Sequence, residues 1–341
     1  MERDTIAVIL AAGEGTRMKS EVPKILHKLC GLPIINYSLD NTAKLSWIKE
    51  TLVILGYKAE EIKSVLPSSL KVVIQREQLG TGHALMQIKK DLEGFKGNIL
   101  VLCADAPLLT LETLENLYQC HKRNNAAATI LTAILDNPKG YGRMVRDKEG
   151  YLKKIIEELD ATSLEREITE VNTSIYCFNW PELLPVLDSL ELNQKKGEYY
   201  LTDCVEKLIE KGLMVTSFQT KDPYEALGIN NRLHLSEAES KLRRKILENL
   251  MLQGITILDL NSTFIDQEVK IEQDTIIYPY TIILGNTFIK NRCLIGPSSC
   301  VINSQVETDS NIFASFIVNS HIERETTIGP YNYFKDNQQL K

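Results

Sequence analysis

The chain has 341 residues, of which 43% are hydrophobic and 25% are charged, and its formal net charge is -6 at pH 7. This length favours two folded domains, and the composition is that of an ordinary globular protein. The acidic balance argues against a nucleic-acid-binding protein, which needs a basic face, although a local group of arginines and lysines can still bind a small anion. No apolar run is long enough to span a membrane, and the N-terminus lacks the layout of a signal peptide. The seven cysteines form no C-x-x-C pair, which predicts reduced thiols and a cytoplasmic location.

Short apolar runs alternate with helix-like segments over the first part of the chain. This alternation predicts an α/β domain with a Rossmann-like, mostly parallel sheet that helices cover on both faces. In such sheets, ligands bind at the carboxyl ends of the strands. Two loops with unusual residues follow predicted strands, at 11–24 and 103–107. The predicted strands cover 7–11, 51–55, 72–75, 99–103, 128–135 and 174–178, and the predicted helices cover 35–43, 82–92, 111–124 and 201–211.

An amphipathic helix is predicted to connect the two domains. Its apolar residues recur at three- and four-residue steps with charged residues between them, and Gly254 follows as a break. The resulting division has a first domain at 1–232, a connecting helix at 233–253, a β-helix at 254–335 and a polar tail at 336–341. The apolar positions of the helix are Leu235, Ala238, Leu242, Ile246 and Leu250.

A six-residue repeat follows this helix. From Ile265 to Val301 an aliphatic residue occupies every sixth position, and small or polar residues lie four positions after most of them. Neither a helix nor an ordinary strand has this period, whereas a left-handed parallel β-helix stacks one such residue under the next in each coil. The register slips after Val301, where Glu307 occupies the next slot. We therefore expect a short left-handed parallel β-helix of a few coils.

The loop after the first predicted strand has the features of a phosphate-binding loop. Residues 11–18 read Ala-Ala-Gly-Glu-Gly-Thr-Arg-Met, and a Pro-Lys pair follows. Gly13 and Gly15 let the backbone approach a ligand because no Cβ intrudes, and exposed N–H groups can hold phosphate oxygens. Arg17 and Lys24 add positive charge. The G-x-G pattern alone would also fit a tight strand-to-helix turn without a ligand.

The complete set of motifs resembles the sugar-nucleotide pyrophosphorylases. G-x-G-T-R-M followed by P-K resembles the signature of that family, and the segment Gln-Arg-Glu-Gln-Leu-Gly-Thr-Gly-His-Ala at 75–84 resembles its uridine-binding loop. The match covers about residues 5–235. It is closest to the uridylyltransferase half of the bifunctional enzyme that makes UDP-N-acetylglucosamine. Further motifs in family order lie at 140–143, 170–173, 197–203 and 228–232.

The resemblance implies transfer of a uridylyl group from UTP to a sugar 1-phosphate, most closely N-acetylglucosamine 1-phosphate, with Mg²⁺ as the cofactor. It implies catalytic roles for Arg17 and Lys24, and it assigns Mg²⁺ to Asp105 and Asn230, since this cation prefers oxygen ligands. Gln75 and Gly80 would read the uracil edge. The implied nucleotide-binding residues are Leu10, Ala11, Ala12, Gly13, Gly15, Thr16, Gln75, Gly80 and Thr81. The implied sugar-phosphate-binding residues are Cys103, Gly142, Glu157, Asn172, Tyr200 and Thr202.

Several departures from the family pattern fall on the sugar side. Cys103 and Ala104 stand where the family has tyrosine and glycine, Ser174 stands for a glycine, and Leu159 stands for a basic residue. Three alternatives therefore stay open: another sugar 1-phosphate, another nucleotide, or a catalytically silent homologue that binds nucleotide.

The resemblance also bears on the second domain. The bifunctional enzymes continue through further coils that carry an acetyl-CoA site, and this chain ends where that site would begin, so no acetyltransferase activity is expected. Parallel β-helices of this kind commonly form trimers through a flat face. A homotrimer is therefore an expected assembly, with a monomer and a dimer as the alternatives.

Overall fold

The computed structural model describes residues 4–340 and divides the chain into two compact units. The second unit contains residues 235–341 and also residues 28–32, which the first unit surrounds in sequence. The predicted division at residue 232 instead places residues 28–32 in the first domain. The cause is hydrogen bonding: the Cys30 N–H donates to Glu239 Oε2 at 2.9 Å, and the Gln267 N–H donates to the Cys30 carbonyl at 3.0 Å. Two short strands form here, β2 (Lys28–Leu29) and β3 (Leu32–Pro33).

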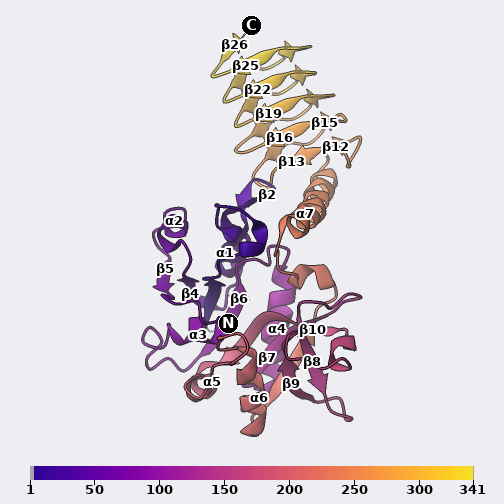
Figure 1. Cartoon of the computed structure of the whole chain (residues 1–341). Helices are drawn as coiled ribbons and strands as arrows, with labels where there is room; N and C mark the ends of the chain where they lie inside the picture. Colours follow the sequence, from indigo (N-terminus) through magenta and orange to yellow (C-terminus); the bar gives the residue numbers. More distant parts are fainter. Residues whose placement is uncertain (1–3, 341) are drawn as a thin grey trace. The chain divides into compact units, whose positions relative to one another are not determined.

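A nine-stranded mixed sheet forms the first unit (Figure 1). Its strands are β1 (Thr5–Ala11), β4 (Ile48–Leu55), β5 (Lys71–Ile74), β6 (Asn98–Cys103), β7 (Ala128–Ile134), β8 (Gly142–Arg146), β9 (Leu152–Ile156), β10 (Glu170–Asn179) and β11 (Val215–Gln219). The order is β11-β7-β10-β6-β1-β4-β5, and β8 and β9 extend from β10. Strands β6, β1, β4 and β5 are parallel, whereas β10 runs antiparallel to β6 and β7. The Rossmann-like α/β domain predicted from the sequence is confirmed.

Helices cover both faces of this sheet, because its central strands are apolar on both sides. Ile6 and Val8 of β1 face a core with α3 (Thr81–Met86), α5 (Trp180–Leu187) and α6 (Thr202–Glu210). Ala7 and Ile9 face a second core with α1 (Ile34–Lys44), α2 (Ala59–Lys63) and α4 (Leu111–Asn124). The helix predicted at 82–92 is wrong beyond Met86. The N–H groups of Gln87 and Ile88 bond three residues back instead of four, so the α-helix ends in tight turns.

Most of α7 (Arg232–Leu252) belongs to the second unit, where it precedes stacked short parallel strands with the arrangement of a left-handed parallel β-helix, as predicted (Figure 1). The strands form three sheets. One contains β12 (Thr256–Ile257), β15 (Ile276–Ile277), β18 (Leu294–Ile295), β21 (Asn311–Ile312) and β24 (Thr327–Ile328). Another contains β13 (Phe264–Ile265), β16 (Ile282–Leu284), β19 (Cys300–Ile302), β22 (Phe316–Val318), β25 (Tyr333–Lys335) and β26 (Gln338–Leu340). The last contains β14 (Lys270–Ile271), β17 (Phe288–Ile289), β20 (Gln305–Val306) and β23 (His321–Ile322).

The slip in the repeat after Val301 is a shortening of the coil. The next buried aliphatic residue is Val306, five positions on, and Glu307 beside it accepts a hydrogen bond from Lys290 at 2.6 Å. The buried column continues through Ile312, so the repeat does not stop. A corner can lose one residue while the strands above and below stay paired. Within the predicted polar tail, β26 pairs antiparallel with β25.

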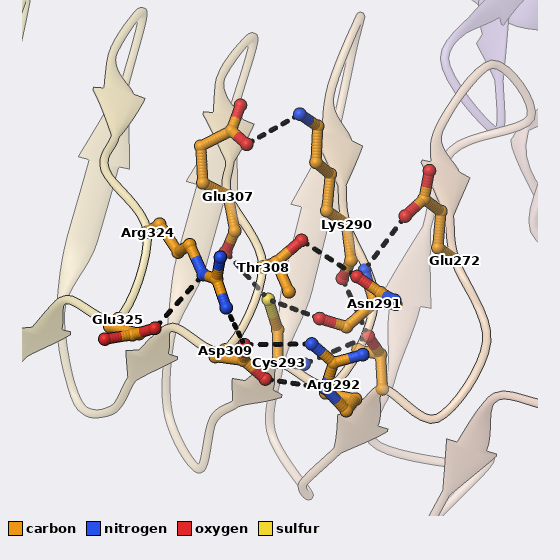
Figure 2. A network of polar contacts seen from close by, with 11 residues as sticks. Glu272, Lys290, Asn291, Arg292, Cys293, Glu307, Thr308, Asp309, Arg324 and Glu325 are labelled. Atoms are coloured by element: carbon orange, nitrogen blue, oxygen red, sulfur yellow. Dashed lines mark hydrogen bonds and ion pairs between the residues drawn. The ribbon is translucent and has the colours of Figure 1, made fainter.

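One corner of the β-helix carries a ladder of paired charges (Figure 2). Arg292 donates to both oxygens of Asp309, from Nε at 2.7 Å and from Nη2 at 2.9 Å, and Arg324 on the next coil donates to the same carboxylate at 3.3 Å. These hydrogen bonds hold the pKa of Asp309 below its usual value. Such solvent-exposed pairs contribute little stability individually. Each joins residues about one coil apart, so together they favour the observed register between coils.

Candidate active site

The loop after β1 is shaped by two contacts of its own. Gly15 has a φ of 64°, and a Cβ there would lie 2.6 Å from Lys24 Cβ, so this position requires glycine. Met18 is 1% exposed and anchors the loop in the protein. A Cβ at Gly13 would meet no atom within 4 Å, so the protein itself does not require glycine at that position. The sequence motif offers an explanation for Gly13: a residue without a side chain leaves room for a ligand.

The two predicted basic residues contact the two predicted metal ligands. Lys24 Nζ forms an ion pair with Asp105 Oδ2, and Arg17 donates a hydrogen bond to Asn230 Oδ1 at 2.9 Å. The Ile229 N–H donates to the Asp105 carbonyl at 2.8 Å, which holds the two metal-ligand candidates beside each other. Residues up to 213 positions apart in the chain therefore meet at the carboxyl ends of β1 and β6.

The oxygen atoms of Asp105 and Asn230 suit a Mg²⁺ ion that has further ligands from outside the protein. A carboxylate and an amide oxygen are too few to enclose the ion, and no group of three or more His, Cys, Asp or Glu suited to a metal exists among residues 4–340. Mg²⁺ is usually held by one or two carboxylates together with water and substrate phosphates. The donor set therefore suits an ion that enters with a phosphorylated substrate.

The predicted uracil-binding residues lie on a loop whose shape is defined by hydrogen bonds. Gln75 is 3% exposed, and its Nε2 donates to the Gly80 carbonyl at 3.1 Å. Gly80 has a φ of 95°, and a Cβ there would lie 2.7 Å from the Tyr199 carbonyl oxygen. Thr81 Oγ1 accepts a hydrogen bond from the Leu201 N–H at 3.2 Å. The orientation of Gln75 leaves its Oε1 as an acceptor for a base that carries an N–H, as uracil does.

The predicted sugar-side residues form a connected group. Thr202 Oγ1 donates to Glu157 Oε1 at 3.1 Å, and a Cβ at Gly142 would lie 3.6 Å from that oxygen and from Asn172 Cβ. Burial raises the pKa of Glu157, and the hydrogen bond from Thr202 opposes the rise. Tyr200 is 7% exposed, and burial raises its pKa to about 12. This group offers hydroxyl, carboxyl and amide partners suited to a sugar.

Other predicted residues have mainly backbone roles in the structure. The Leu10 carbonyl accepts from the Ala104 N–H at 3.0 Å, and the Ala12 carbonyl accepts from the Tyr57 N–H at 3.2 Å. Cys103 Sγ lies 3.5 Å from the Ser174 carbonyl oxygen, and burial raises the pKa of its thiol to about 12. A raised pKa favours the neutral thiol, which is a weak nucleophile. The remaining members of the predicted set are Ala11, which is buried, and Thr16, which is exposed.

The structure adds contacts that sequence reasoning missed. Lys58 donates to the Glu21 carbonyl of the phosphate loop. Tyr176 accepts a hydrogen bond from Asn172 Nδ2 at 2.7 Å. The only sequence signal for Tyr176 was its even spacing from Asn172, which places both side chains on one face of a strand. That signal does not distinguish a core residue from one that supports the site.

Comparisons with known proteins support this arrangement. Residues 6–234 match the model of a protein family described as nucleotidyl transferase. The chain belongs to this family. It is 45% identical over 334 residues to the bifunctional protein GlmU of Clostridioides difficile (strain 630), which covers 98% of this chain and 72% of that relative. It is 44% identical over 335 residues to the bifunctional protein GlmU of Clostridium novyi (strain NT), with 98% and 73% covered.

Membership of the nucleotidyl transferase family establishes the protein as a nucleotidyltransferase enzyme similar to the GlmU proteins. The matched segment contains all the predicted site residues, from Leu10 to Asn230. Within the part of the chain that the structure describes, no helix is both long enough and apolar enough to cross a bilayer.

Proposed function

We propose that this nucleotidyltransferase transfers the uridylyl group of UTP to N-acetylglucosamine 1-phosphate, giving UDP-N-acetylglucosamine and pyrophosphate. The observation that supports it most directly is the meeting of Arg17 and Lys24 with Asp105 and Asn230 beside the phosphate loop. The Gln75 loop supports a uracil base, and the similarity to GlmU proteins supports the acceptor. Cytidine carries no N–H at the corresponding ring nitrogen, so an acceptor at Gln75 Oε1 would favour uridine over cytidine.

The reaction needs positioning and charge more than proton transfer. A phosphate oxygen of the sugar 1-phosphate attacks the α-phosphorus of UTP, and the bond from that phosphorus to the β-phosphate oxygen breaks. The electron pair leaves with pyrophosphate. A phosphate monoester is already an anion, so no general base is required. Arg17 and Lys24 bind the phosphates, hold them in line and stabilise the charge on the leaving group.

Asp105 and Asn230 would hold Mg²⁺ in the productive complex. When bound, the ion supplies Lewis-acid stabilisation of the phosphate charge. In the structure, Lys24 engages Asp105 Oδ2 and Arg17 engages Asn230 Oδ1. The phosphates of UTP are the natural alternative partners for both cations. Nucleotide binding would thus free Asp105 and Asn230 while it satisfies Lys24 and Arg17.

Pyrophosphate release provides the test of this proposal. UTP, Mg²⁺ and a panel of sugar 1-phosphates should give pyrophosphate, with the highest kcat/KM for N-acetylglucosamine 1-phosphate. Removal of the divalent ion with EDTA should abolish the reaction. A higher kcat/KM for glucose 1-phosphate would change the acceptor, an alternative motivated by the departures of Cys103 and Ser174 from the family pattern. Tight UTP binding without turnover on any sugar would instead indicate a catalytically silent homologue.

We also propose that the protein is a homotrimer through one sheet of the β-helix. In the sheet that runs from β13 through β16, β19 and β22 to β25, exposed apolar side chains lie in register on every strand except β19, whose Cys300 is buried, and Phe316 is 56% exposed. A closed symmetric assembly would bury this row. Light scattering should give the mass of three chains, and Phe316→Glu should dissociate them. Lys270→Glu on another sheet should leave the mass unchanged. A monomeric wild type would refute the trimer.

A further inference from the structure

An irregular stretch of β10 lies within the sugar-side group. Asn172 pairs with Thr132 of β7 and Tyr176 pairs with Ile130, so four residues of β10 span two of its partner. Four residues of a regular strand extend about 13 Å, too far for their side chains to meet easily. The bulge shortens this distance. Its middle residue, Ser174, has a φ of 60°, and bulges of this kind often redirect side chains beside active sites.

The bulge engages both ends of the Asn172 side chain. Its Oδ1 accepts a hydrogen bond from the Ser174 N–H at 3.1 Å, and its Nδ2 donates to Tyr176 Oη at 2.7 Å. If the Asn172 amide were rotated by 180°, its NH₂ group would face the Ser174 N–H, and two donors would meet. The hydrogen bonds therefore fix one orientation of this amide. One N–H of Asn172 is then committed to Tyr176. The second N–H would then be the group that donates to a ligand beside Gly142, whose Cβ position lies 3.6 Å from Asn172 Cβ.

We infer that Tyr176 is a positioning residue that determines affinity for the acceptor sugar by orienting Asn172, without touching the substrate. The inference rests on the proposed function and on the sugar-phosphate-binding role that the family resemblance implies for Asn172. The Asn172 N–H would donate to an oxygen of the sugar, either a hydroxyl or the acyl carbonyl.

The surroundings of Tyr176 support a fixed role for its hydroxyl. The residue is 2% exposed, and its ring stacks on Phe178 with centroids 5.2 Å apart. Burial raises the pKa of Tyr176 well above its ordinary value, so the hydroxyl stays protonated and neutral. A neutral oxygen held in a packed core is a good acceptor for one defined N–H. The ring is positioned by packing, and the hydroxyl transmits that position to Asn172.

Tyr176→Phe tests the inference because phenylalanine keeps the packing and removes only the hydroxyl. We expect the KM for N-acetylglucosamine 1-phosphate to rise about tenfold, with the KM for UTP unchanged. Tyr118→Phe is the matched control, because Tyr118 is also buried at 4% exposure and donates to Asp4 Oδ1 at 2.9 Å, before the start of β1. This control should alter stability and leave both KM values unchanged.

A double-mutant cycle separates positioning from a general structural effect. In an Asn172→Ala background, Tyr176→Phe should change the sugar KM no further, because the residue it orients is gone. Additive effects would overturn the inference. An equal rise in the KM for UTP would also overturn it, since that indicates a general loss of structure.

A spectroscopic measurement tests the same inference if the enzyme shows no turnover. Side-chain amide signals of isotope-labelled asparagine should show slow hydrogen exchange for Asn172 in the wild type and fast exchange in Tyr176→Phe. Equal exchange in the two proteins would overturn the role of Tyr176. Failure of the proposed function alone would appear differently, as absent pyrophosphate release with the exchange difference intact.

Discussion

Lys24→Met should lower kcat for pyrophosphate release by about a hundredfold or more, since one preorganised charge at a phosphate is worth that much. The same change should strengthen binding of Mn²⁺, a probe for Mg²⁺, when no nucleotide is present. Lys24 pairs with Asp105 in the structure, and both side chains are mostly buried, at 15% and 19% exposure. Removing the ammonium group leaves the carboxylate without its cation, which a divalent ion can then replace. Activity and metal affinity should therefore move in opposite directions.

Lys19→Met is the control for Lys24→Met. Lys19 lies on the same loop and is exposed to solvent, so its loss changes the loop's charge equally without touching Asp105. It should change kcat and Mn²⁺ affinity little. Metal affinity can be followed by the loss of the free-ion signal in electron paramagnetic resonance. If Lys24→Met weakened Mn²⁺ binding without nucleotide, the exchange of Lys24 for a metal ion at Asp105 would be wrong.

Gly80→Ala should raise the KM for UTP about tenfold or more, since a strained backbone costs roughly 1–3 kcal/mol and the loop must shift to relieve it. The φ of 95° at Gly80 disfavours any side chain, and the added Cβ would lie 2.7 Å from the Tyr199 carbonyl oxygen. The carbonyl of Gly80 also accepts the hydrogen bond from Gln75. A displaced loop would therefore misorient the amide proposed to read uracil. Initial rates at varied UTP concentration measure the effect.

Gly94→Ala separates backbone strain from loop displacement. Gly94 also has a positive φ, of 73°, but a Cβ there would meet no atom within 4 Å. We expect this control to lower the unfolding temperature slightly and to leave the KM for UTP unchanged. If wild type and Gly80→Ala had a similar KM for UTP, the loop at Gln75 and Gly80 would not be part of the UTP-binding site.

The second domain and the phosphate loop were predictable from the sequence because each depends on local pattern. In a β-helix, the six-residue period places every buried aliphatic residue, so Ile265 to Val301 could be assigned by counting. The slip at Glu307 was also visible in the sequence, but its form, a corner shortened by one residue, required the structure. The loop at Gly15 was equally readable, since a positive φ is a property of that residue and its neighbours.

Tertiary structure alone decided which distant side chains meet. Arg17 and Asn230 are 213 residues apart, and only the order of the strands brings them within 2.9 Å. Tyr176 could not be distinguished from an ordinary core residue, because its link to Asn172 depends on a bulge in β10 where it pairs with β7. Segment 28–32 joined the second unit through hydrogen bonds that no local pattern encodes. Local pattern determined the elements and the chemical groups they carry, and long-range packing determined their partners.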